Sequence, residues 1–193
     1  EAPRDVDYFL VQVEYHTAEN RHEVALAAAE RAIALAGPER PERAELARAA
    51  SLRALGRLEE ALTHLDALLV RSPTSIAARV ERARVHLSAD RKPEADADID
   101  AALAAEPGNL EALALRFPLE RTLSEESATR LAAIREWAER HPDAAGAWLW
   151  FGLMQSKAGA AEDSIDRLKK AVSLAPNDDD IRATYWIELG RAG

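Results

Sequence analysis

Side chains that commonly carry catalysis or bind metal ions are scattered along this sequence. No two histidines are separated by three or four residues, so none are neighbours on one helix face; they are His16, His22, His64, His86 and His141. The acidic run at residues 178–180 is typical of the first turn of a helix, and a metal site is the alternative interpretation. The chain contains no Gly-rich phosphate loop and neither a G-x-S-x-G nor an H-E-x-x-H motif. We therefore expect no catalytic residue, no cofactor and no metal ion.

Charge and composition exclude several kinds of partner. The 193 residues include 25 basic and 34 acidic side chains and carry a net charge of -9. Binding to nucleic acid requires basic surface to neutralise phosphates, so no nucleic-acid partner is expected. No apolar run approaches the length of a membrane-spanning helix, so we expect no direct membrane insertion. Cysteine is absent, which excludes a disulfide framework and thiolate metal sites.

The compartment stays open between the cytoplasm and the periplasm or another exported location. A chain without cysteine suits either environment. The sequence begins with Glu1 rather than Met, from which we expect a processed or excised chain whose signal peptide would no longer be visible.

A fixed interval separates similar residues along the chain. Pro73 and Pro107 are 34 residues apart, as are Pro142 and Pro176, and 35 residues separate Pro107 from Pro142. Triplets of small or apolar residues at helical spacing precede the loops that end the units: Ala25, Ala29, Ala32; Ala61, Leu65, Leu68; Ala95, Ile99, Ala102; and Ser164, Leu168, Ala171. Ala, Leu, Arg and Glu dominate, and these residues favour helices. Residues 16–116 contain no aromatic residue other than histidine, which a stack of small helical units tolerates.

The stretch 143–176 resembles one tetratricopeptide repeat (TPR). That family has the signature W-x2-L-G-x2-Y, then A-x3-F, then P, over 34 residues. The matching positions hold Trp148, Phe151, Gly152, Gln155, Ser164, Leu168, Ala171 and Pro176. The resemblance implies an all-α fold, a right-handed α-solenoid of antiparallel helix pairs (the TPR superhelix) with about 11 helices. We expect a single solenoid over residues 1–193, with repeats at about 5–38, 41–73, 74–107, 108–142 and 143–176 and a capping helix at 177–192.

Local signals place several helix ends. Pro118 falls where a helix of the fourth repeat should continue, so it must kink that helix or end it early. Polar residues with short side chains precede the other expected helices as N-caps. They are Thr74 or Ser75, Asn109, Ser124 and Asn177.

The resemblance also indicates which residues face a partner. In this family the first helix of each repeat lines a concave groove that holds extended or helical peptides. The corresponding positions here are Arg53, Glu81, Arg84, Leu115 and Arg121. The three arginines would form a spaced basic row, and guanidinium groups suit the carboxylates of a peptide. In the alternative interpretation, Glu81 pairs with Arg84 or with another neighbour.

A second group of candidates lies in the last repeat. At 100° per residue, Leu149, Trp150 and Leu153 fall on the helix face opposite Trp148. We expect Trp148 in the core and the other three in an anchor pocket for a partner, since Trp is frequent in binding hot spots. Alternatively, Trp150 packs on the final helix near Trp186 and its neighbour Ile187.

The resemblance implies a non-enzymatic protein–protein interaction scaffold that binds a peptide or protein in the concave groove. Some members bind chaperone tails through a Lys/Asn clamp, but the matching positions hold Leu10, Glu14 and Ala47, so we do not expect that ligand. The alternative is a regulatory or substrate-presenting arm of a larger, multidomain bacterial enzyme or envelope-assembly protein. Coding sequence for further domains beyond Gly193 would favour that alternative. Self-association through the terminal helix is a further hypothesis, and the Ala/Arg bias is typical of a GC-rich bacterium.

Overall fold

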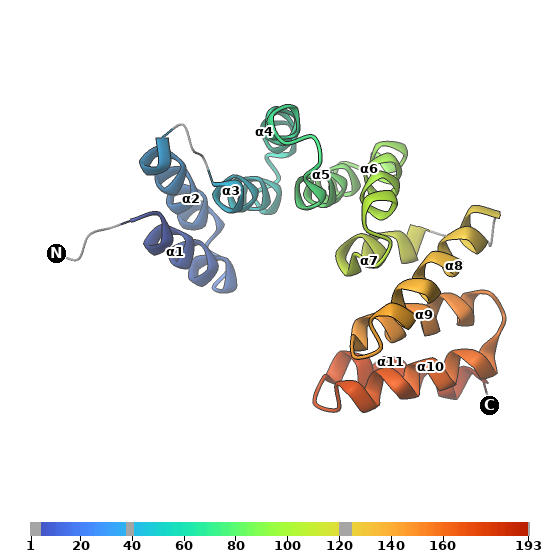
Figure 1. The fold of residues 1–193 in the computed structure, drawn as a ribbon. Helices are drawn as coiled ribbons and strands as arrows, with labels where there is room; N and C mark the ends of the chain where they lie inside the picture. The colour runs from blue at the N-terminus through green and yellow to red at the C-terminus, as the bar shows by residue number, and fades with distance from the viewer. Residues whose placement is uncertain (1–4, 38–40, 120–124, 193) are drawn as a thin grey trace. The chain divides into compact units, whose positions relative to one another are not determined.

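The computed structural model describes residues 5–37, 41–119 and 125–192, which form helices joined by short loops (Figure 1). No strand occurs in these three ranges, and the predicted all-α class and helix number are confirmed. The helices are α1 (Val6–Ala18), α2 (His22–Ala36), α3 (Glu42–Ala54), α4 (Leu58–Arg71), α5 (Ile76–Ser88), α6 (Lys92–Ala105), α7 (Leu110–Leu119), α8 (Glu125–Arg140), α9 (Ala145–Lys157), α10 (Ala161–Leu174) and α11 (Asp179–Ala192).

The helices belong to two compact units, residues 1–101 and 102–193, and the division falls within α6. In the first unit, α1 packs against α2, α2 against α3, α3 against α4 and α4 against α5. In addition, α1 contacts α3, and α3 contacts α5. In the second unit, α8 to α11 pack in sequence and α7 contacts α9. Helix pairs stacked through their first helices are the arrangement of an α-solenoid. The single-domain description and its repeat limits stay predictions.

The same tight turn joins the two helices in several of these pairs. One residue in each turn has a left-handed backbone: Asn20 (φ 55°), Gly56 (φ 74°), Asp90 (φ 56°) and Gly159 (φ 80°). The next residue's N–H then donates to a carbonyl five positions earlier, for example from Arg57 to Leu52 at 2.9 Å and from Ala160 to Gln155 at 3.0 Å. This is the Schellman motif at a helix C-terminus. It favours Gly, because a Cβ is strained in the left-handed region, and Asn is the next most frequent residue there.

Two of the four predicted helix starts are confirmed. The side-chain oxygen of Ser75 accepts the N–H of Ala78 at 3.0 Å, and Asn109 Oδ1 accepts the N–H of Ala112 at 3.0 Å. The predicted cap at Ser124 lies outside the described residues. The predicted cap at Asn177 is wrong: α11 begins at residue 179, so Asp178 precedes it and caps Ile181 N at 3.0 Å. An Asp is as good an N-cap as an Asn, and the helix start decides between them.

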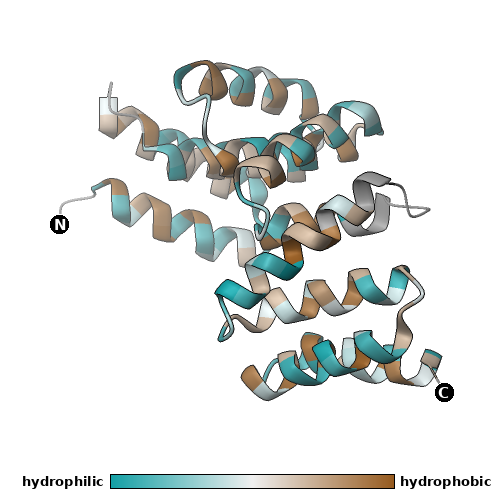
Figure 2. Ribbon diagram, turned by 45° about the vertical axis from the view of Figure 1, so that its right-hand side comes forward, coloured by the Kyte–Doolittle hydropathy of each residue, from teal (hydrophilic) through white to brown (hydrophobic). Residues whose placement is uncertain are grey.

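The core consists of the small and apolar residues that recur along the sequence. Every member of the four predicted triplets is at most 2% exposed. Brown, hydrophobic segments alternate with teal ones along the helices in Figure 2, as expected for helices that bury one stripe. The helix of the fourth repeat that contains Pro118 is α7, and the described residues reach one position beyond this proline, to Leu119. Whether Pro118 kinks this helix or ends it early stays a prediction.

Candidate partner-binding surface

Two arginines share one buried carboxylate at the contact between α3 and α5. Arg53 lies near the end of α3, whereas Glu81 and Arg84 lie on α5. Arg53 Nε donates to Glu81 Oε1 at 2.9 Å, and Arg84 Nη1 donates to Glu81 Oε2 at 3.1 Å. The Glu81 side chain is 7% exposed, and the two arginine side chains are 31% and 32% exposed. We call these three residues the Arg–Glu–Arg cluster.

The cluster contains two of the three arginines of the predicted basic row, whose role in binding stays a prediction. The fold brings Arg53 and Arg84 together, although 28 residues separate Arg53 from Glu81 in the sequence. Glu81 contacts both arginines, so the alternative of a simple pair with a neighbour also holds in part. Within the cluster, two guanidinium groups outweigh one carboxylate, so the sum of its three formal charges is positive. Arg121 lies outside the described residues, so the row is described only at two positions.

The apolar candidates lie in the second unit. Leu115, on α7, is half-buried, and so are Leu149 and Trp150 on α9. Leu153 is 9% exposed and belongs to the core. Trp150 therefore offers more accessible surface to a partner than Leu153 does.

Trp148, on the opposite side of α9, is in the core as predicted. It is 7% exposed, and its indole N–H donates to the carbonyl of Pro142 at 3.2 Å. Lys170 Nζ lies 3.5 Å from the centre of its ring, which is a cation–π contact. These contacts fix α9 against α10, and they leave Trp148 with a structural role.

A second charged network, which the sequence pattern did not reveal, ties α5 to α6. Asp98 is 2% exposed, and its carboxylate accepts two hydrogen bonds from Arg82, at 2.7 and 2.6 Å. Arg82 also donates to Asp66 of α4 at 2.7 Å. The hydrogen bonding to Asp98 is the main cause that raises the pKa of Arg82 above its ordinary value, so Arg82 keeps its charge. In the sequence, Asp98 is marked only as an acidic residue next to Ile99 and near Ala95, two members of a predicted apolar triplet.

Comparison with known proteins shows which proteins share this architecture. Residues 42–85, which cover α3, α4 and most of α5, match the family model described as tetratricopeptide repeat. The chain has a tetratricopeptide-repeat fold. A search of the curated proteins found no match.

Solved TPR structures superpose over nearly the whole chain. A thermophilic TPR protein of Thermus thermophilus is 18% identical with a TM-score of 0.68, covering 95% of this chain and 98% of that one. A TPR protein from Parabacteroides merdae ATCC 43184 is 18% identical with a TM-score of 0.60, covering 97% and 75%. YrrB, described as a TPR protein with an unusual peptide-binding site, is 16% identical with a TM-score of 0.50, covering 90% and 88%. Identities this low establish the shared fold alone.

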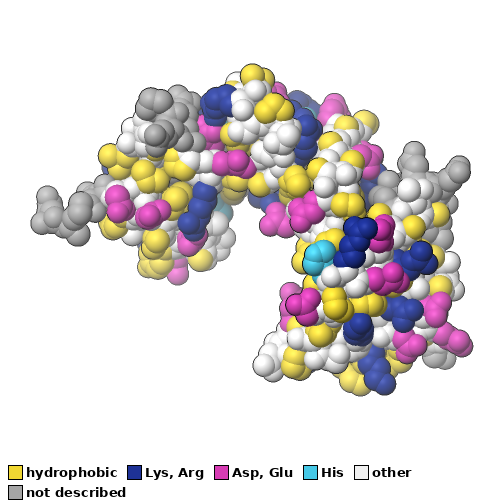
Figure 3. Space-filling view, viewed as in Figure 1, with side chains coloured by type: hydrophobic (Ala, Val, Ile, Leu, Met, Phe, Trp, Pro, Cys, Tyr) yellow, Lys and Arg dark blue, Asp and Glu magenta, His cyan; other side chains and the backbone are white. Residues whose placement is uncertain are grey.

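The TPR fold suggests a role in protein–protein interaction. Stacked helix pairs present extended surfaces to partners, and proteins built this way are generally scaffolds rather than enzymes. Figure 3 shows Lys and Arg side chains interspersed with Asp and Glu on the visible face, without one large basic area. Among the described residues, no group of three His, Asp or Glu side chains could hold a metal ion. None of the described helices is long and apolar enough to cross a membrane.

The last TPR helix leaves apolar side chains in solvent. Trp186 and Ile187 on α11 are 64% and 55% exposed, whereas Glu188 is buried and accepts a hydrogen bond from Ser156 of α9. Nothing in the structure shows what covers this face. Self-association through α11 therefore stays a prediction.

Proposed function

We propose that the chain is a non-enzymatic scaffold that binds a peptide or protein segment carrying a carboxylate, through the Arg–Glu–Arg cluster on α3 and α5. The observation that supports this proposal is the sharing of Glu81 by Arg53 and Arg84. A buried carboxylate holds both guanidinium groups in place, and about a third of each arginine side chain remains exposed.

The positive charge of the cluster selects the chemistry of the ligand. Arg53 donates one of its five N–H groups to Glu81, so its partly exposed guanidinium group can also donate to an incoming Asp, Glu or C-terminal carboxylate. Guanidinium groups that are already oriented lose little side-chain freedom on binding, which favours affinity. A carboxylate is also the group for which the planar N–H fork of Arg has matching geometry. The ligand is therefore an acidic peptide segment rather than a basic or purely apolar one.

The half-buried Leu149 and Trp150 are the proposed apolar contact of the same scaffold in its second unit, together with Leu115. Trp supplies much of the binding energy in many protein interfaces. YrrB, a protein of this fold, has an unusual peptide-binding site, and this supports a peptide as the ligand proposed for this chain. The two groups of residues belong to different units.

Selection from a library of random peptides tests the proposal. Peptides that bind the wild-type chain should be enriched in Asp, Glu or a free C-terminus, because the cluster is positively charged. The double variant R53Q/R84Q should lose this enrichment. R91Q is the matched control, because Arg91 is a partly exposed arginine of the same unit that pairs with exposed Glu59. Selection of acidic peptides to the same extent by R53Q/R84Q would refute the proposal.

A further inference from the structure

His64 of α4 holds one specific protonation state through two fixed partners. Its Nε2 lies 3.1 Å from the backbone carbonyl of Glu45, and its Nδ1 lies 3.0 Å from Arg48 Nη1. A carbonyl oxygen can only accept a hydrogen bond, and a guanidinium N–H can only donate one. His64 must therefore carry its single proton on Nε2 and accept from Arg48 at Nδ1. Both hydrogen bonds together exist only while the imidazole is neutral.

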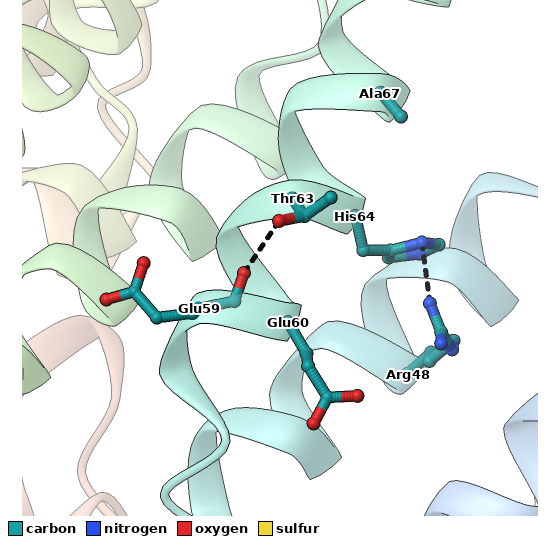
Figure 4. Close-up of a pocket in the computed structure, with 6 residues that line it drawn as sticks. All are labelled: Arg48, Glu59, Glu60, Thr63, His64 and Ala67. Carbon is teal, nitrogen blue, oxygen red and sulfur yellow. Dashed lines mark hydrogen bonds between the residues drawn. The ribbon is translucent and has the colours of Figure 1, made fainter.

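A second proton on His64 breaks the contact with Arg48. That proton would occupy Nδ1, which is the atom that accepts from the guanidinium group, and two cations would face each other across 3.0 Å. Arg48 belongs to α3, so its hydrogen bond to His64 joins α3 to α4 (Figure 4). Loss of this bond leaves His64 joined to α3 only through its Nε2 hydrogen bond to the carbonyl of Glu45.

The charged groups around His64 mainly oppose its protonation. Burial is the largest cause that lowers the pKa of His64, and the charge of Arg48 is the second. Glu45 acts in the opposite direction through its carboxylate and its backbone carbonyl, while Arg71 lowers the pKa further. Glu30 of α2 and Glu60 of α4 face Arg48 rather than the imidazole. Glu60 is already bound by Arg57 through two hydrogen bonds, at 2.8 and 2.7 Å.

Arg48 has an alternative acceptor and space to reach it. Its Nε lies 3.4 Å from Glu30 Oε1, which is a weak contact that a small rotation would improve. One hollow, of about 240 Å³, is lined by Arg48 and His64 together with Glu30, Ile33 and Ala34 of α2. The hollow drawn in Figure 4, of about 460 Å³, lies beside the same two side chains and is lined further by residues 59, 60, 63 and 67 of α4.

We propose that His64 and Arg48 form a pH-sensitive latch within the first unit. At neutral pH, the neutral imidazole accepts from Arg48 and joins α3 to α4. In mild acid, His64 takes a proton at Nδ1 and releases Arg48, whose guanidinium group then shortens its existing contact with Glu30 and links α3 to α2 alone. This change alters the side-chain contacts among α2, α3 and α4, while the Arg–Glu–Arg cluster keeps its own contacts.

Proton NMR titration of the full chain tests the latch. The imidazole signals of His64 should titrate at lower pH than those of a histidine in an unstructured peptide, and the Arg48 Nε–H signal should change with the same midpoint as His64. In the variant R48M, the midpoint of His64 should move upward, because a cation has been removed from its side. In H64Q, the Arg48 signal should no longer respond over that pH range.

Two results would overturn the proposal. One is an Arg48 signal that stays constant while His64 titrates, because the two groups would then not be linked. The other is a His64 midpoint in R48M equal to that in the wild type. R91Q removes an arginine that pairs with Glu59 rather than with His64, so it is the matched control and should leave the His64 midpoint unchanged. Circular dichroism at each pH verifies that the helices persist, so that unfolding does not imitate release of Arg48.

Discussion

Gly152 lies where α9 crosses α10, and replacing it by Ala should destabilise the second unit. A Cβ at this position would stand 2.8 Å from Leu168 Cγ and 3.1 Å from the backbone carbonyl oxygen of Ser164. Leu168 is completely buried, so it has no free space into which to retreat. The helices must therefore move apart, or Leu168 must leave its preferred rotamer.

The magnitude follows from two opposing effects. Forcing an extra methyl group into a packed core costs about 1–3 kcal/mol. Ala is a better helix former than Gly by about 1 kcal/mol, which offsets part of that cost. We expect a net loss of about 1 kcal/mol in the free energy of unfolding. Gly190→Ala on α11 is the control, because its Cβ would meet no atom within 4 Å and only the helix-forming gain should remain.

Urea unfolding monitored by tryptophan fluorescence measures both variants. All four Trp residues lie between positions 137 and 186, so the signal reports on the second unit. Gly152→Ala should lower the midpoint, and Gly190→Ala should leave it unchanged or raise it. In a Leu168→Val background, Gly152→Ala should cost less, because the contact is with the Leu side chain. If Gly152→Ala proved as stable as Gly190→Ala, the close approach of α9 and α10 would be refuted.

Three further predictions concern charge and exposure. The pKa of His64 is lowered in the folded chain, so the unfolded chain takes up the proton first as pH falls. Neutral His64 therefore makes its full contribution to the free energy of unfolding above about pH 6.5, and this contribution declines below that pH. Between pH 7.5 and pH 5.5, the melting temperature should fall less for H64Q than for the wild type. Asp98→Ala removes the buried partner of Arg82, so we expect a cost of about 3 kcal/mol in urea unfolding followed by circular dichroism; a cost below about 1 kcal/mol would contradict a structural role for the pair. If α11 self-associates, sedimentation velocity should show a species heavier than the monomer that grows with concentration and disappears in Trp186→Ala; identical monomers for both chains would exclude this mode of association.

The sequence was sufficient for the fold because the decisive information is local and repeated. The proline spacing and the triplet Ala61, Leu65, Leu68 depend only on helix periodicity, and the structure buries all three residues. The N-cap at Ser75 was predicted for the same reason. The error at Asn177 arose because two adjacent residues cap equally well and a helix start is uncertain by one residue.

Contacts between helices were harder to predict. Helix periodicity shows which face of a helix is buried, but it does not show which residues of another helix meet that face. The link from Arg53 to Glu81 spans 28 residues, and the proposed latch between Arg48 and His64 spans 16. His64 appeared in the sequence as one of five scattered histidines, and its protonation state follows only from the partners of its two ring nitrogens, the carbonyl of Glu45 and Arg48. The role of Glu81 as the shared acceptor likewise depends on how α3 and α5 are stacked.

The affinity of one acidic peptide for matched variants tests the central claim most directly. A fluorescently labelled peptide from the library selection is titrated into the wild type, R53Q/R84Q and R91Q, once with free carboxylates and once with every carboxylate amidated. A hydrogen bond between charged groups contributes about 1.5–3 kcal/mol, so we predict at least a roughly tenfold weaker Kd for R53Q/R84Q and an unchanged Kd for R91Q. Amidation should weaken binding to the wild type by a similar factor and should have little effect on R53Q/R84Q. Equal affinity of the wild type and R53Q/R84Q for the unmodified peptide would contradict the proposal that this cluster binds the partner.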